Sequence, residues 1–140
     1  MSRVIATRSP GKIRNQHRRT IAEAVRRLSQ KAQIDQESKD LAALIVFCLQ
    51  GMSDTVDQTI EAWEKRDYWL KAERFREEWR WIDPVTDQLS TIIHQGQWEE
   101  LPAVLASMMP HFSDVKIRKM TRKSSLWQGA FDKFMGASES

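Results

Sequence analysis

The stretch from Asp54 to Trp81 contains no glycine or proline and is dense in Glu, Lys, Arg and Trp. Its apolar residues recur at helical spacing, which predicts an α-helix. At about 3.6 residues per turn they fall into two groups, the second roughly 100–160° from Trp63. The first group is Val56, Ile60, Trp63 and Leu70, and the second is Tyr68, Phe75, Trp79 and Ile82. The helix either breaks at residues 65–67 or continues with a new packing partner, and we favour a break.

The composition favours helices over strands throughout. The 140 residues include only five Gly and four Pro, which leaves little material for many turns, and no segment stands out as a strand. A hydrophobic fraction of 41% and a charged fraction of 29% are typical of one globular domain with one core. We therefore expect an all-α fold, an irregular bundle of about five helices.

The first helix is expected at residues 10–32. Ser9 is a favourable N-cap, and the proline that follows it suits a first helical turn because it has no amide hydrogen to leave unpaired. Lys12, Arg19 and Arg26 recur every seven residues on the side opposite the apolar stripe. These three side chains define a basic ridge.

The second helix should begin near Asp35 and run through residues 41–49, which are apolar nearly all round. Such a pattern is typical of the most buried helix of a domain. Gly51 is a possible interruption, because glycine is unfavourable in helix interiors.

Three shorter helices are expected nearer the C-terminus. Residues 84–95 follow an Asp-Pro step, and Gly96 should end them as a C-terminal cap. Residues 98–109 and 126–135 also show helical apolar spacing, and the last of these is amphipathic.

Composition divides the chain into three parts. Residues 1–9 are expected to form a flexible basic arm, because they hold two arginines and few residues that could anchor them. Residues 10–112 should form the helical core domain. Residues 113–140 read as a basic linker followed by the C-terminal amphipathic helix, so both termini should extend from the core.

Charge is sorted along the chain. Residues 1–31 hold nine Lys or Arg and one acid, Glu23, whereas residues 32–112 hold fifteen acids and seven Lys or Arg. The net charge of +3 therefore conceals a basic N-terminal region. This region is solvated, docks on the acidic helix near residues 54–67, or contacts an external acidic partner such as the phosphates of nucleic acid. The residues expected to make that contact are Arg3, Arg8, Lys12, Arg19 and Arg26.

Six tryptophans are many for this length. Most fit the expected core, but some fall off the buried stripe and are better candidates for a protein interface, and base stacking is a further use of aromatic residues interleaved with arginine. The terminal amphipathic helix is a second candidate, because such a helix can dock in a partner's groove. The candidate protein-interface residues are Trp69, Trp81, Trp127, Phe131 and Phe134.

No catalytic, cofactor-binding or metal-ligating set is apparent. The chain has no Glu-x-x-His spacing, its three histidines are far from one another, and its glycines are too scattered for a phosphate-binding loop. Cys48 lies in the most apolar segment, where a thiol is buried and poorly reactive. We therefore expect a protein that is not an enzyme and needs no cofactor.

The leading hypothesis is a non-enzymatic helical interaction, adaptor or assembly protein that binds itself or another protein. The alternative is an accessory nucleic-acid-binding protein that contacts phosphates non-specifically through its basic N-terminal region. The longest apolar run, residues 41–49, is far shorter than the roughly 20 residues that span a bilayer, so no membrane partner is expected. A single cysteine and the lack of a leader pattern favour a cytoplasmic location.

Overall fold

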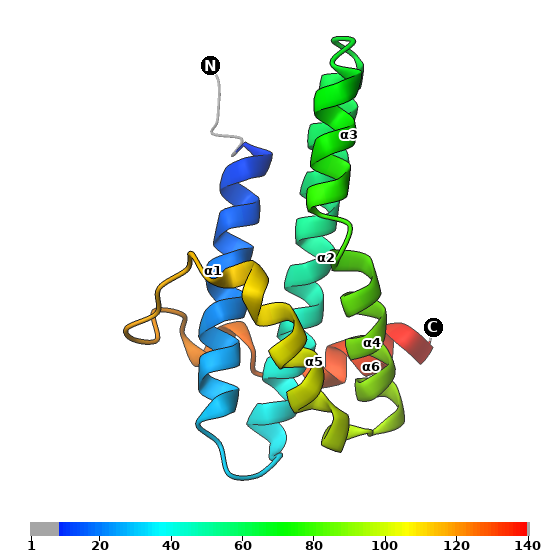
Figure 1. The fold of residues 1–140 in the computed structure, drawn as a ribbon. Coiled ribbons are helices and arrows are strands. Elements are labelled where there is room, and N and C mark those ends of the chain that lie inside the picture. Colours follow the sequence, from blue (N-terminus) through cyan, green and yellow to red (C-terminus); the bar gives the residue numbers. More distant parts are fainter. Residues whose placement is uncertain (1–8, 140) are drawn as a thin grey trace, which may run out of the picture.

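A computed structural model describes the backbone of residues 9–139 and the side chains of residues 9–136 (Figure 1). This part of the chain is all-α, as the sequence predicted. Its helices are α1 (Pro10–Ser29), α2 (Gln36–Glu64), α3 (Trp69–Glu78), α4 (Ile82–Gln95), α5 (Leu101–Met108) and α6 (Ala130–Glu139). Its short 3₁₀ helices are η2 (Trp98–Glu100), η3 (Met109–Phe112) and η4 (Ser124–Leu126).

The start of α1 follows the predicted capping pattern. The Ser9 hydroxyl accepts a hydrogen bond from the Lys12 amide at 3.2 Å, which satisfies one of the free donors of the first turn. Ser9 therefore belongs to the helix rather than to the arm assigned from sequence. Arg3 and Arg8 of that arm lie outside the described residues.

The long helix α2 is the centre of the fold. It packs against α1, α3, α4 and α6, and its middle supplies fully buried residues such as Leu41, Ile45 and Leu49. Gly51 does not interrupt it. A Cβ atom at this position would clash with the His17 ring on α1, so Gly51 permits a close approach of the two helices rather than ending one of them.

The tryptophan-rich stretch breaks at residues 65–67, as favoured from its rotating apolar face. Asp67 takes a left-handed backbone conformation with φ of 62°, which reverses the chain. α3 then returns along the second half of α2, and the resulting hairpin stands clear of the body in Figure 1.

The C-terminal region packs on the core instead of extending from it. Trp127, Ala130 and Phe134 are buried members of the same apolar cluster as α2. Asp40 of α2 anchors the start of α6, because its carboxylate accepts hydrogen bonds from the amides of Phe131 at 2.9 Å and Gly129 at 3.3 Å.

The remaining helices follow their local signals. Gly96 caps α4 in the left-handed conformation with φ of 67°, as expected. The segment predicted as one helix at 98–109 begins as η2, continues as α5 and ends as η3. None of the helices within residues 9–139 is both long and apolar enough to cross a membrane.

Candidate interaction surfaces

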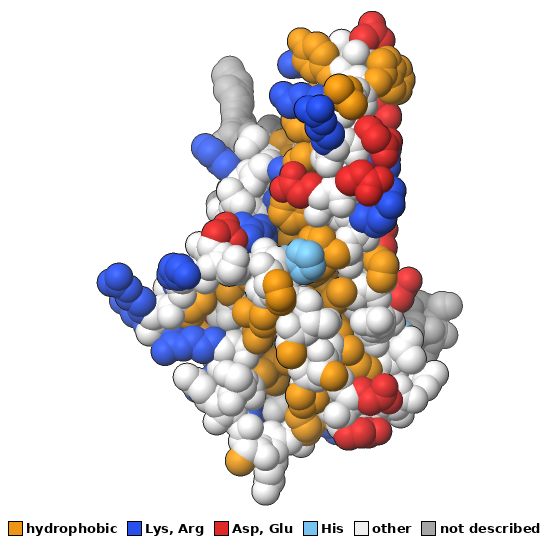
Figure 2. All heavy atoms as spheres, viewed as in Figure 1, with side chains coloured by type: hydrophobic (Ala, Val, Ile, Leu, Met, Phe, Trp, Pro, Cys, Tyr) orange, Lys and Arg blue, Asp and Glu red, His pale blue; other side chains and the backbone are white. Residues whose placement is uncertain are grey.

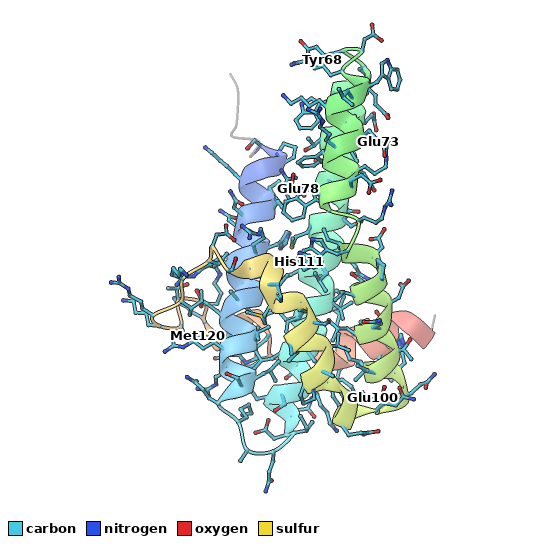
Figure 3. All side chains as sticks on the ribbon, in the orientation of Figure 1. Tyr68, Glu73, Glu78, Glu100, His111 and Met120 are labelled. Carbon is cyan, nitrogen blue, oxygen red and sulfur yellow. The ribbon has the colours of Figure 1, made fainter. Side chains whose placement is uncertain are left out.

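The end of the α2–α3 hairpin presents three consecutive apolar side chains to solvent. Tyr68, Trp69 and Leu70 are 50%, 59% and 65% exposed, and we call them the hairpin tip. Figure 2 shows apolar side chains gathered at this end of the molecule, and Figure 3 places Tyr68 there. The cations Arg66 and Lys71 flank the tip and are also exposed.

The hairpin that carries the tip is braced along its length. The rings of Trp63 and Phe75 meet edge to face with centroids 5.0 Å apart, and the Lys71 ammonium lies 4.4 Å from the Trp63 ring. Arg76 of α3 forms an ion pair with Glu64 of α2 at 3.0 Å. The tip therefore sits on a supported projection.

Arg14 of α1 contacts aromatic rings at the base of the hairpin. The Arg14 guanidinium lies 4.9 Å from the ring of Phe75 and 5.3 Å from that of Trp79, and it donates a hydrogen bond to Thr55 at 3.2 Å. Partial burial lowers the pKa of Arg14, which nevertheless stays charged at neutral pH. This cation of the basic N-terminal region is thus used inside the molecule.

The residues proposed from sequence for a protein interface are not gathered in one place. Trp69 is at the exposed tip, whereas Trp127 and Phe134 are buried in the protein's own core. Trp81 is partly buried and stacks on His111 with centroids 4.2 Å apart. Phe131 is partly buried beside Trp98. In this structure only Trp69 of the set is open to a partner.

A second surface is built where the chain between η3 and η4 lies along α1. Its anchor is Glu23, whose side chain is buried and accepts hydrogen bonds from the Thr121 amide at 2.6 Å and the Arg122 amide at 3.0 Å. Arg19 donates to the same carboxylate at 2.6 Å. Residues 113–123, which we call the basic loop, are thereby fixed against the ridge side of α1.

Further hydrogen bonds hold the basic loop to α1. The Arg122 guanidinium donates to the Gln16 carbonyl at 3.1 Å and to the Thr20 hydroxyl at 3.0 Å. Arg19 donates to the Lys116 carbonyl at 3.3 Å. The basic N-terminal helix and the basic C-terminal linker, far apart in sequence, are therefore side by side.

The electrostatics of Glu23 reflect this anchoring role. Burial by itself would raise its pKa, but the hydrogen bonds from Thr121, Arg19 and the Arg122 amide outweigh that effect and hold the pKa at about 2. Glu23 is therefore a carboxylate at neutral pH, and the hydrogen bonds that it accepts, from Thr121 first, keep it ionised.

The basic ridge does not dock on the acidic part of α2. Within residues 9–136, no ion pair joins α1 to residues 54–67. Arg18 pairs instead with Asp114 of the basic loop, and Arg27 with Glu37 at the start of α2. The predicted phosphate-contact residues Lys12, Arg19 and Arg26 thus stay on the outer side of α1, together with the loop.

An apolar groove lies between the end of α1 and α5, at the opposite end of the molecule from the hairpin tip. It has a volume of about 560 Å³. Its walls include Leu28, Leu101 and Leu105, and Ile34 and Glu99 also line it. We call it the α5 groove.

Metal binding and thiol chemistry would each require a particular arrangement of the described residues. No group of three or more His, Cys, Asp or Glu side chains among them is placed to bind a metal ion. Cys48 and His17 line one surface groove between α1 and α2, but burial raises the pKa of Cys48 to about 12 and lowers that of His17. The thiol therefore stays protonated at neutral pH and is a poor nucleophile.

Comparison of the chain with protein-family models, with curated proteins and with solved structures gave no match.

Sequence reasoning missed two parts of these surfaces. Tyr68 and Leu70 were assigned to buried faces, because their positions on an ideal helix ignore the turn that exposes them. Glu23 was counted only as the single acid in a basic region. Glu23 lies four residues after Arg19 on the ridge side of the helix, a spacing at which the two side chains can pair. This spacing could have predicted that a second basic segment packs there.

Proposed function

We propose that this protein is a non-enzymatic interaction protein that docks onto a partner protein through its hairpin tip. The observation that supports this most directly is the exposure of Tyr68, Trp69 and Leu70 side by side. Single exposed apolar residues are ordinary, but a contiguous group is typical of a binding site. Tryptophan and tyrosine are also the residues that most often dominate interface energetics.

The side chains of the hairpin tip indicate which kind of site on a partner would bind it. An apolar pocket would receive the side chains of Trp69 and Leu70, and acidic residues at its rim would complement Arg66 and Lys71. The α5 groove, which is apolar and has Glu99 in its lining, fits this description. A second copy of the chain is therefore the first partner to test.

Sedimentation equilibrium over a range of concentrations tests self-association through these surfaces. We expect the wild type to associate and Trp69→Ala to remain monomeric, while Leu126→Ala, which truncates an exposed leucine elsewhere, behaves as the wild type. A mixture of Trp69→Ala with the groove variant Ala106→Arg should form dimers and nothing larger, because each variant keeps one intact half of the interface.

A different partner is tested by quantitative affinity capture from cells that express the protein naturally. Proteins bound by the wild type and by Leu126→Ala, but lost with Trp69→Ala, would support docking through the tip. Monomeric behaviour at all concentrations, combined with identical captured sets for the three proteins, would rule out the tip as a docking element.

A further inference from the structure

We propose that α1 and the basic loop together form one binding face for the phosphate backbone of double-stranded nucleic acid. This face is separate from the hairpin tip and goes beyond the proposed docking function. It joins four cations of the basic loop to Lys12, Arg19 and Arg26 of the ridge. The four are Lys116, Arg118, Lys119 and Lys123.

The first support is that the two basic segments are joined by a buried carboxylate. Four hydrogen bonds reach Glu23, from the amide and hydroxyl of Thr121, the amide of Arg122 and the guanidinium of Arg19. The carboxylate is removed from solvent, so its negative charge holds the loop in place without offering an exposed acid on the face. The same arrangement turns two separate runs of positive charge into one.

The second support is that most cations of this face have no carboxylate partner, although Arg18 pairs with Asp114 and Arg19 with Glu23. Lys12, Arg26, Lys116, Arg118, Lys119 and Lys123 form no ion pair within residues 9–136. Most ion pairs in this part of the molecule lie elsewhere, on the hairpin and at the α1–α2 connection. Figure 2 shows basic side chains clustered where the loop projects beside α1, and Figure 3 labels Met120 of that loop. Cations without carboxylate partners attract an extended polyanion.

The third support is the shape and polarity of the face. The ridge from Lys12 to Arg26 extends for about 21 Å along α1 at 1.5 Å per residue, long enough to follow several phosphates of a duplex. The large exposed apolar side chains of the described chain are Ile34, Tyr68, Trp69, Leu70 and Leu126, and none belongs to α1 or the basic loop. A face without exposed aromatic residues suits phosphates rather than stacked single-stranded bases or a protein hot spot.

Fluorescence anisotropy with a labelled 20-base-pair DNA duplex and the full-length protein tests the proposal at several salt concentrations. We expect binding that weakens steeply as salt rises, since each neutralised phosphate releases counterions. The variant Lys116→Glu/Arg118→Glu/Lys119→Glu should weaken binding at least tenfold and reduce the log–log salt slope by about three. Its three positions are exposed, so the fold should persist, as circular dichroism will check.

The matched control changes the same amount of charge on the hairpin, away from α1 and the basic loop. Lys65→Glu/Arg74→Glu/Arg80→Glu also replaces three exposed cations, and it should alter affinity no more than about threefold, because charges away from the proposed face are screened at moderate salt. Equal losses in the two triple variants would show that only net charge matters and would overturn the site.

The variant Glu23→Ala distinguishes binding to an ordered face, in which the basic loop is fixed on α1, from attraction that depends on net charge alone. This change makes the protein more positive, so charge alone predicts tighter binding. If Glu23 fixes the loop on α1, the variant should instead bind the duplex more weakly, by about threefold or more. Tighter binding would contradict the composite face, and Thr121→Ala gives a milder test should Glu23→Ala fold poorly.

Two competing ligands decide the class of partner. Single-stranded DNA of equal charge should bind more weakly than the duplex, and a polyglutamate peptide should not compete at equal charge concentration. No duplex binding even at low salt, or stronger binding by either competitor, would overturn the proposal.

Discussion

At the scale of single residues, Glu23 shows how one acid can organise a basic region. It is buried, accepts several hydrogen bonds and joins segments nearly a hundred positions apart. Burying a carboxylate is costly unless it is paired and hydrogen-bonded, and here Arg19 and two backbone amides meet that need. The residue therefore stabilises the fold and positions the basic loop at the same time.

Glu23→Gln should change how stability depends on pH. The pKa of Glu23 is held at about 2, below its ordinary value of 4.5, so its contribution is present above pH 4.5 and is lost as the pH falls toward 2. We expect the variant to be less stable by about 1.5–3 kcal/mol at pH 7, since hydrogen bonds to a charged group are lost. Denaturant titrations from pH 7 to 2 should show the two curves converging below pH 4.5. A difference that is constant over this range would contradict the account.

Gly51 provides a second test at this scale, through its contact with His17. An alanine in the middle of a helix is normally favoured over glycine by about 0.5–1 kcal/mol. In the wild type, the new Cβ would meet the His17 ring, so Gly51→Ala should instead destabilise the protein by about 1–3 kcal/mol.

The same substitution in a His17→Ala background should become stabilising, because the clash is gone and only helix propensity remains. Chemical denaturation of all four proteins completes the double-mutant cycle. Equal effects of Gly51→Ala in both backgrounds would mean that the two helices do not meet as described.

At the scale of elements, local signals predicted where helices begin and end better than what they pack against. The Ser9 cap, the Gly96 cap and the break at residues 65–67 were all readable, because each depends on neighbouring residues. The projection of the hairpin could not be predicted, since apolar periodicity shows which face of a helix is buried but not which element covers it. For the same reason Gly51 was expected to interrupt α2, because the His17 side chain that requires a glycine there belongs to α1.

The hairpin should also be the less stable part of the molecule. Ala72 is the only buried residue of α3, whereas the middle of α2 is almost fully buried. Local opening requires less free energy where few apolar contacts are lost. Native-state hydrogen exchange should therefore show that amides of α3 open at lower free energy than those of residues 41–49. Equal protection of both segments would indicate that α3 unfolds only with the whole domain.

At the scale of the whole molecule, the structure separates two surfaces of different chemistry. The apolar hairpin tip lies at one end, and the composite basic face lies on the side of α1 (Figure 2). Of the interface residues expected from sequence, Trp69 is exposed at the tip, whereas Trp127 and Phe134 are covered by the chain's own core. Their burial depends on long-range packing of α6 and of the residues just before it on the core, which apolar spacing alone leaves open.

The most direct test of docking through the hairpin tip is site-specific photo-crosslinking in the cells that make the protein. A photoreactive phenylalanine analogue is placed at position 69 in one variant and at position 126, also exposed, in another. Docking through the tip predicts a discrete crosslinked protein from position 69 that is absent from position 126, and its loss when Leu70 is changed to Asp. No discrete product from position 69, or the same products from both positions, would contradict it.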